Sequence, residues 1–242
     1  MKAVIYVVGM LLLITACVGK EVKSNLKNKP NIEYPAALVH QLDKFPLLQV
    51  PYSIDSVFFD ADSALQIGTG TLYAPTVKLL STPMASDEVS RREQYYLNDY
   101  FKIAKAKKDG KYAALKANLD IGMTENAVCN PVGRIEFGDT AALLIWEIKY
   151  ESFPACPSYF GHDLLGSYIQ HGKVISCMHL ASRESGADAP MFYETFQLAK
   201  IDQQGRINIK TSSKTQEDST VVEQSKSHFH YQITTRGFKL LK

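Results

Sequence analysis

Residues 144–150 read Leu-Ile-Trp-Glu-Ile-Lys-Tyr, and this alternation decides the fold class. Trp146, Ile148 and Tyr150 share one side of an extended chain, with Glu147 and Lys149 between them. A period of two is typical of a β-strand that buries one face. We therefore expect a strand here, with its aromatic face in the core.

The C-terminal half repeats this pattern in strand pairs that are joined by glycine turns. The predicted pairs are residues 168–171 with 174–180, 192–198 with 206–209, and 228–234 with 238–241. The turn glycines are 28, 34, 33 and 32 residues apart, at Gly110, Gly138, Gly172, Gly205 and Gly237. This spacing suits a meander of two-stranded units, as an open curved sheet, a barrel or a small propeller-like fold. A plain antiparallel meander without a repeat is the alternative.

Helix signals are confined to the first part of the folded region. Leu38, Leu42 and Phe45 have near-helical spacing after Pro35, so we expect a short helix there. Thr82-Pro83 can begin a second helix, because two acidic residues follow in its first turn. We expect this helix over residues 82–98, an extended chain over residues 47–59, and one or two strands over residues 64–80.

A further hairpin is predicted just before the strand-rich half. Residues 113–121 alternate between apolar and polar side chains, and Asp109-Gly110 before them favours a two-residue hairpin turn. Residues 100–108 would then be the partner strand, although their lysines also fit a helix that continues from residues 82–98. Residues 211–226 are almost entirely polar and predict a surface loop.

Length and composition fit one folded domain with a tail. The chain has 242 residues, of which 45% are hydrophobic and 21% charged, and this composition excludes a disordered chain. A net charge of +2 is too small for nucleic-acid binding by phosphate neutralisation. We expect a single β-rich domain over residues 32–242, a mainly β antiparallel meander with one or two N-terminal helices.

The N-terminus carries an export signal. Met1-Lys2 precedes a stretch that is apolar from Ala3 to Ile14 apart from Gly9. Its dozen residues make roughly 18–20 Å of helix, too short for the ~30 Å hydrocarbon core of a bilayer. The following Ile14-Thr15-Ala16-Cys17 resembles the lipobox of bacterial lipoprotein precursors, with Ile14 where Leu is usual. An ordinary cleaved secretion signal is the alternative.

The resemblance implies a lipid-anchored protein of the bacterial cell envelope. It makes residues 1–16 a signal peptide and Cys17 the mature N-terminus, which carries a diacylglycerol and, in Gram-negative bacteria, a third acyl chain. Several chains give stable anchoring. Val18 stands where an Asp favours inner-membrane retention, so the resemblance implies the outer membrane. Residues 17–31, with four lysines, then form a flexible tether.

The strand-turn-strand pattern from Tyr168 to Leu180, with Gly172-Lys173 at its turn, resembles uncharacterised β-rich lipoproteins of Gram-negative bacteria. This resemblance extends over about the last 140 residues and brings no known catalytic residues with it.

Three cysteines remain if Cys17 is lipidated, and three single-disulfide pairings are possible. Cys129 and Cys156 both lie in proline-marked stretches that predict loops, so we expect a disulfide between them. Cys177 lies inside a predicted strand and fits a buried apolar residue.

No motif for catalysis, metal binding or cofactor binding stands out. The chain lacks the nucleophile motifs of hydrolases, and its paired histidines do not add up to the three or four ligands of a zinc site. We therefore expect no catalytic residue, no metal and no cofactor. Surface aromatic residues could bind sugars or a protein, and the candidates are Tyr95, Tyr96, Tyr100, Tyr159 and Phe160.

These observations favour a non-catalytic binding or accessory lipoprotein, with the membrane and a protein or glycan as partners. The alternative is a hydrolase that faces the periplasm or the cell surface. An enzyme requires a pocket in which titratable side chains converge. The candidates are His162 and Asp163 in a predicted loop, His179, Glu184 and Asp188 in a predicted loop over residues 183–188, and His228 and His230.

The lipobox makes a direct prediction for Cys17. Mass spectrometry of the mature protein from Gram-negative cells should show cleavage before Cys17 and the added mass of the acyl chains. The Cys17→Ser variant should remain unacylated and leave the membrane fraction, because it lacks the thiol that accepts the diacylglycerol. An unmodified Cys17, or cleavage elsewhere, contradicts the lipoprotein interpretation.

Overall fold

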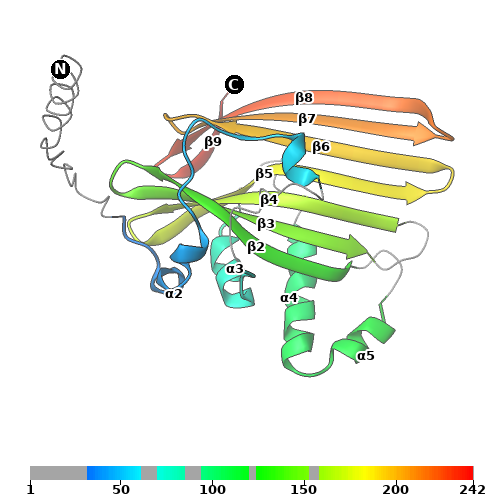
Figure 1. The fold of residues 1–242 in the computed structure, drawn as a ribbon, viewed down its shortest axis with the longest axis horizontal. Helices are drawn as coiled ribbons and strands as arrows, with labels where there is room; N and C mark the ends of the chain where they lie inside the picture. Colours follow the sequence, from blue (N-terminus) through cyan, green and yellow to red (C-terminus); the bar gives the residue numbers. More distant parts are fainter. Residues whose placement is uncertain (1–31, 61–69, 85–93, 120–123, 153–157, 242) are drawn as a thin grey trace, which may run out of the picture.

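A meandering antiparallel sheet carries most of the chain (Figure 1). In the computed structural model, residues 32–60, 70–84, 94–119, 124–152 and 158–241 are described. Eight consecutive strands follow one another across the sheet, and the short β1 (Tyr52–Ile54) pairs with β6. The eight are β2 (Thr124–Phe137), β3 (Ala141–Ser152), β4 (Ser158–Gln170), β5 (Lys173–Asp188), β6 (Met191–Ile201), β7 (Arg206–Glu217), β8 (Thr220–Thr234) and β9 (Gly237–Leu241).

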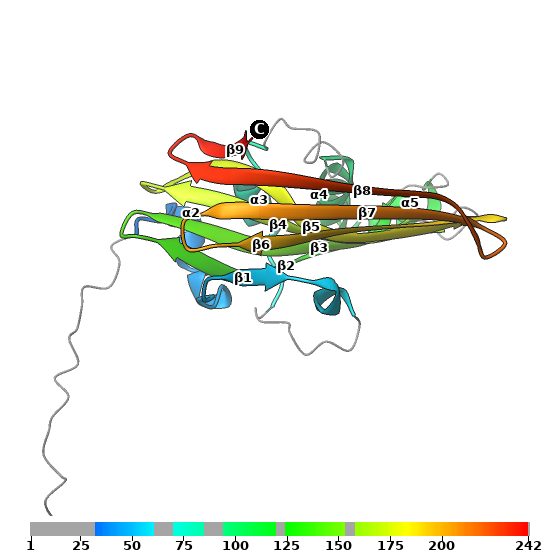
Figure 2. The same ribbon diagram turned by 90° about the horizontal axis from the view of Figure 1, so that it is seen from above.

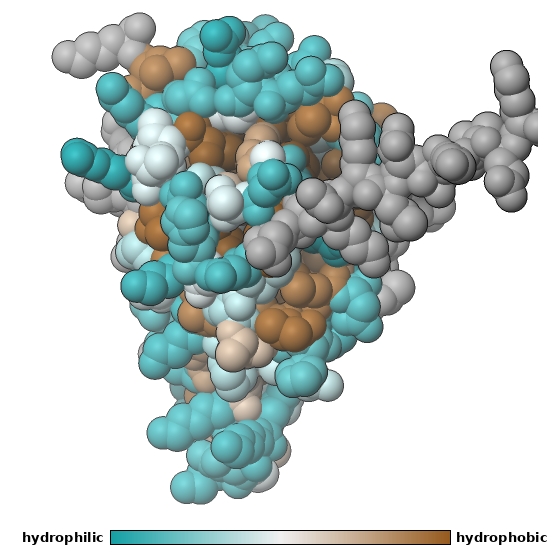
Figure 3. Space-filling model, turned by 90° about the vertical axis from the view of Figure 1, so that its left-hand side faces the viewer, coloured by the Kyte–Doolittle hydropathy of each residue, from teal (hydrophilic) through white to brown (hydrophobic). Residues whose placement is uncertain are grey.

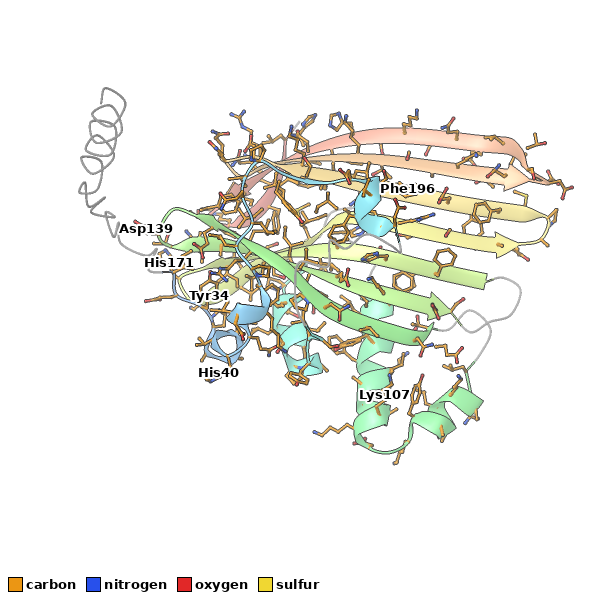
Figure 4. The ribbon with its side chains drawn as sticks, in the orientation of Figure 1. Tyr34, His40, Lys107, Asp139, His171 and Phe196 are labelled. Atoms are coloured by element: carbon orange, nitrogen blue, oxygen red, sulfur yellow. The ribbon has the colours of Figure 1, made fainter. Side chains whose placement is uncertain are left out.

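The sheet is open, so of the three predicted forms the curved sheet is the correct one. Four of the five turn glycines have positive φ at the turns between β2 and β3, β4 and β5, β6 and β7, and β8 and β9. These are alternate turns of a meander, so they lie at one end of the sheet; Asp139 and His171 mark this end in Figure 4. The spacing near 32 residues therefore reflects two-stranded units, as predicted.

Helices lie on one side of the sheet and β1 lies on the other (Figures 1 and 2). The first side carries α3 (Ala74–Leu80), α4 (Gln94–Lys108) and α5 (Tyr112–Ala117). The other side carries β1 and η2 (Ser56–Phe59). The chain enters through α2 (Ala36–Val39) and η1 (Leu42–Lys44), which occupy the predicted first helix. Among the described residues, none of the helices has the length and apolar character needed to cross a membrane.

Strand β3 separates two hydrophobic cores, of which the alternation of residues 144–150 predicts the one that contains Trp146, Ile148 and Tyr150. Leu144, Trp146, Ile148 and Tyr150 pack on the helix side, and Leu143 and Ile145 pack on the side of β1. Trp146 also ties the layers together. Its Nε1 donates to Ser167 Oγ at 2.8 Å, and Ser167 Oγ donates to the Leu80 carbonyl of α3, also at 2.8 Å.

Strands β5 and β6 part midway, which distinguishes this sheet from a plain meander. Their pairing ends at Ser182 and Gln197, after which β6 pairs with β1 instead. Backbone groups on the edge of β5 that β6 leaves free bond to other segments: Cys177 N donates to the Pro83 carbonyl at 2.8 Å. The Gln197 amide also donates to the carbonyls of His179 and Leu180, at 3.3 and 3.2 Å. Both new edges are therefore hydrogen-bonded.

The predicted hairpin over residues 100–121 is wrong, and its helical alternative is correct. Residues 94–108 form α4, because Tyr96, Leu97, Tyr100 and Ile103 bury a stripe at helical spacing. Asp109-Gly110 ends this helix, and Gly110 takes the positive φ typical of a residue after a helix C-terminus. Residues 112–117 then form α5 and not a strand.

Three other local predictions fail for related reasons. Residues 74–80 form α3, since Pro75 begins a helix and does not end a strand. The polar residues 211–226 lie in the β7–β8 hairpin, and residues 183–188 continue β5. Polar side chains predict exposure to solvent. A two-stranded hairpin that extends beyond the rest of the sheet exposes its side chains as well as a loop does. Residues 64–69 of the predicted strands over 64–80, and residues 85–93 of the predicted helix over 82–98, lie outside the described residues.

Candidate functional site

A cleft of about 720 Å³ opens on the β1 side of the sheet, between η2 and strands β2 to β5. Three strands contribute side chains at the same level: Lys149 pairs with His162, and His162 pairs with Arg183. Directly paired residues point to the same face of a sheet. Phe58 and Phe59 of η2 form one wall, and Phe160 and Val128, 48% and 41% exposed, form the other.

A hydrogen bond between the side chains of Glu147 and His162 forms the floor of the cleft. Glu147 Oε2 lies 2.6 Å from His162 Nε2. The other oxygen, Oε1, accepts from Asn130 Nδ2 at 2.8 Å and lies 3.3 Å from Lys149 Nζ. The edge of Phe59 meets the His162 ring at a centroid distance of 5.0 Å, so η2 fixes the imidazole from above.

These partners determine the charge state of Glu147, which is only 4% exposed. Burial on its own would raise the pKa of this carboxyl, since it penalises the charged form. The hydrogen bond and charge of His162, the hydrogen bond from Asn130 and the charge of Lys149 outweigh burial, and the pKa is lowered. Glu147 is therefore a carboxylate at neutral pH and a poor proton donor.

Arg183 closes the cleft towards β6. Its guanidinium lies 3.7 Å from Asp60 Oδ1 and 3.4 Å from Glu194 Oε1, and it stacks over the Phe196 ring at 5.3 Å. Figure 4 shows Phe196 beside η2. The carboxylates of Asp60, Glu147 and Glu151 and the cationic side chains of Lys149 and Arg183 all line the cleft, so charges of both signs alternate along it.

Cys129 lies on the opposite face of the sheet, within the helix-side core. It belongs to β2 and not to a loop, because its stretch pairs with β3. Its side chain is fully buried and forms no disulfide with another described residue. Burial, followed by the negative charge of Glu147, raises its pKa well above the ordinary 9.0, so Cys129 supplies no thiolate nucleophile. Cys156 lies outside the described residues, and its pairing with Cys129 stays a prediction. Cys177 is buried in β5, as predicted.

The sequence candidates for a hydrolase do not gather in one pocket. His162 and Asp163 are neighbours on β4, not in a loop, and so they point to opposite faces. Asp163 lies instead 3.6 Å from His179, and both are almost fully buried. Glu184 is likewise buried in β5, in which Asp188 also lies.

His228 and His230 contact each other on β8, which is four strands from β4. The described residues contain no cluster of three His, Cys, Asp or Glu side chains that could hold a metal ion.

Of the aromatic candidates, only Phe160 belongs to the cleft. Tyr96 and Tyr100 are buried beneath the sheet, where Tyr96 stacks on Tyr150 and the Tyr100 hydroxyl donates to the Leu72 carbonyl at 3.0 Å. Tyr96 and Tyr100 are therefore core residues, and they are excluded as candidates for a surface platform. The side chains of Tyr95 and Tyr159 lie outside the described residues.

The sequence reasoning missed Glu147, Lys149 and the aromatic pair Phe58-Phe59. The alternation of residues 144–150 did place Glu147 and Lys149 on one face, but it suggested a solvated face. The sequence pattern around Glu147, between Trp146 and Ile148, is the same whether that face of the strand is exposed to solvent or covered by another segment. The segment that covers it, residues 52–60, is distant in sequence.

No protein-family model, no curated protein and no solved structure matches this chain.

The lowered pKa of Glu147 predicts a pH-dependent stability. The charged carboxylate stabilises the folded state above its ordinary pKa of 4.5, and this stabilisation is lost as the pH falls through the lower folded-state pKa. Glu147→Gln should therefore reduce the free energy of unfolding most at neutral pH, and the difference from wild type should shrink towards acid pH. Urea unfolding at several pH values measures it.

Glu151→Gln is the matched control, because Glu151 lies on the same strand face but is exposed. It should change the free energy of unfolding by no more than about 0.5 kcal/mol. A Glu147→Gln difference that grows as the pH falls contradicts the ion-pair assignment.

Proposed function

We propose that this protein is a lipid-anchored binding protein of the bacterial envelope and that its cleft binds a neutral glycan. The lipid anchor rests on the lipobox ending at Cys17 and implies the outer membrane. The binding role rests on the cleft between η2 and strands β2 to β5. The two parts have separate tests.

One observation carries the binding role: apolar walls enclose a floor that offers both hydrogen-bond donors and acceptors. Ligand sites are typically clefts of 300–1,000 Å³ with apolar walls and a few placed polar groups, and this cleft of about 720 Å³ falls within that range. Exposed aromatic rings such as Phe160 present a flat apolar surface to a sugar ring. Lys149, Glu151 and Arg183 can bond to its hydroxyls.

The presence of both carboxylates and cationic side chains in the cleft decides between classes of ligand. An anionic ligand would meet Asp60, Glu147 and Glu151, and a cationic ligand would meet Lys149 and Arg183. Neutral hydroxyls can bond to both kinds of group at once. A protein partner fits the same walls, but a cleft closed on one side by η2 favours a small unit such as a sugar over a flat protein surface.

The state of Glu147 supports binding over catalysis. Its carboxylate is held by three partners and its pKa is lowered, whereas a general acid needs a raised pKa. Its oxygens are thus committed to fixing His162 and Lys149 in place.

A hydrolase is the second candidate, because one observation favours it. A histidine held by a carboxylate at 2.6 Å is the arrangement that orients a general base, so His162 could activate a water in the cleft. Incubation of bound oligosaccharides with the protein tests this role. Products that disappear with His162→Gln would favour the hydrolase, and unchanged oligosaccharides favour the binding protein.

The glycan role is tested on an array of neutral and acidic oligosaccharides. We expect neutral oligosaccharides to be retained, and Phe160→Ser to weaken their binding by about fivefold to tenfold, because it removes the exposed stacking surface. A stacking contact contributes about 1 kcal/mol or more, which corresponds to several-fold to tenfold in affinity.

Phe192→Ser is the control, because Phe192 is a 39% exposed phenylalanine of β6 that does not line the cleft. It should leave binding within about twofold of wild type. Retention of acidic oligosaccharides alone, or equal losses in the two variants, would overturn the proposed ligand class.

A further inference from the structure

The helix layer carries a concentration of positive charge that the cleft does not use. Residues 94–118 contain six lysines and two aspartates, a net charge of +4, while the whole chain has a net charge of only +2. Two of the lysines are neutralised, Lys102 by Asp99 at 3.0 Å and Lys116 by Glu125. Within the described part of the chain, the ion pairs do not include Lys105 or Lys108, nor Lys78 of the neighbouring α3.

These three lysines surround an apolar groove. The groove lies between α3 and α4, with a volume of about 970 Å³. Pro75, Met84, Leu97, Phe101 and Ala104 line it, and Lys78, Lys105 and Lys108 stand at its rim. All three rim lysines are exposed. The groove therefore joins an apolar floor to a cationic border.

The groove belongs to the helix layer, which lies on the side of the sheet opposite β1. In Figure 1, α3, α4 and α5 all project from the same side of the sheet, and the chain enters beside α2 on that side. Figure 4 shows His40, at the end of α2, and Lys107 of α4 both pointing away from the sheet. In Figure 3, mainly hydrophilic side chains cover this lower end of the molecule. The basic surface can thus meet a plane without interference from the sheet.

We propose that this surface docks on an anionic phospholipid membrane. The rim lysines contact the phosphate groups, and the end of one acyl chain enters the α3–α4 groove. Each lysine near an anionic bilayer contributes about 1 kcal/mol, or roughly fivefold in partitioning. The apolar groove adds burial that a purely cationic patch lacks. Docking this way leaves the cleft, on the opposite side of the sheet, facing away from the membrane.

Vesicle binding by the full chain tests the charge contribution. Vesicles of phosphatidylcholine alone are compared with vesicles that also contain one quarter phosphatidylglycerol. The variant Lys78→Gln/Lys105→Gln/Lys108→Gln should bind the anionic vesicles about a hundredfold more weakly than wild type, which is fivefold for each of three lysines. Its binding to phosphatidylcholine should not change.

The matched control is Lys210→Gln/Lys226→Gln/Lys239→Gln, which removes three exposed lysines from β7, β8 and β9. It makes the same change in net charge, and the lysines of residues 17–31 are identical in both variants. The control should bind anionic vesicles within about threefold of wild type. Equal losses in the two triple variants would overturn the proposal, because net charge would then explain the binding.

Entry of an acyl chain into the groove has its own readout. The chain has one tryptophan, and Trp146 is fully buried, so its fluorescence provides a constant background. Ala104→Trp should show a blue shift and quenching by brominated acyl chains on anionic vesicles. Val221→Trp on β8 should show neither, since it lies outside the helix layer. An Ala104→Trp signal that does not respond to anionic vesicles would overturn the assignment of the groove.

Discussion

Where two strands of a sheet part, their backbone N–H and C=O groups need new partners, and this requirement shapes the protein at the junction of β5 and β6. Beyond Ser182 and Gln197 the two strands no longer pair. Strand β1 occupies the freed edge of β6, residues 83 and 84 occupy that of β5, and the Gln197 amide bonds to two β5 carbonyls at the point of division. Segments from before the sheet in the sequence therefore complete its interior.

The cleft follows from this arrangement. Because β1 is bound to β6, the next residues, η2, come to lie over β3 and β4 and supply the Phe58 and Phe59 wall. The wall covers one side of the Glu147–His162 pair, and burial of that pair is compensated by Asn130 and Lys149. A sheet face that the alternation alone would leave to solvent thereby becomes a lined site with a fixed floor.

Much of the sheet was predictable from sequence because the signals are local. The alternation at 144–150 and the glycine turns depend on neighbouring residues alone, and the structure confirms the strand and four of the five turns. The helices were harder to predict, because Asp109-Gly110 favours a hairpin turn and is equally suited to end a helix. The helix forms because Tyr96, Tyr100 and Ile103 pack as a buried stripe against β2 and β3, and this packing is not visible in the local sequence. The cleft was not predictable, since Phe59 and His162 are brought together by pairing between β1 and β6, about 150 residues apart in sequence.

The central claim is that β1 pairs stably with β6 and holds η2 over the cleft. Amide hydrogen exchange of the folded protein, resolved to single residues by NMR, measures this directly. The account predicts that amides in Tyr52–Ile54 and Ala199–Ile201 that bond across the ladder exchange at least about a hundredfold more slowly than in an unstructured chain. Exchange of the β1 amides at unstructured rates, with β6 and β7 still protected, would show that the wall is not fixed and would contradict the account.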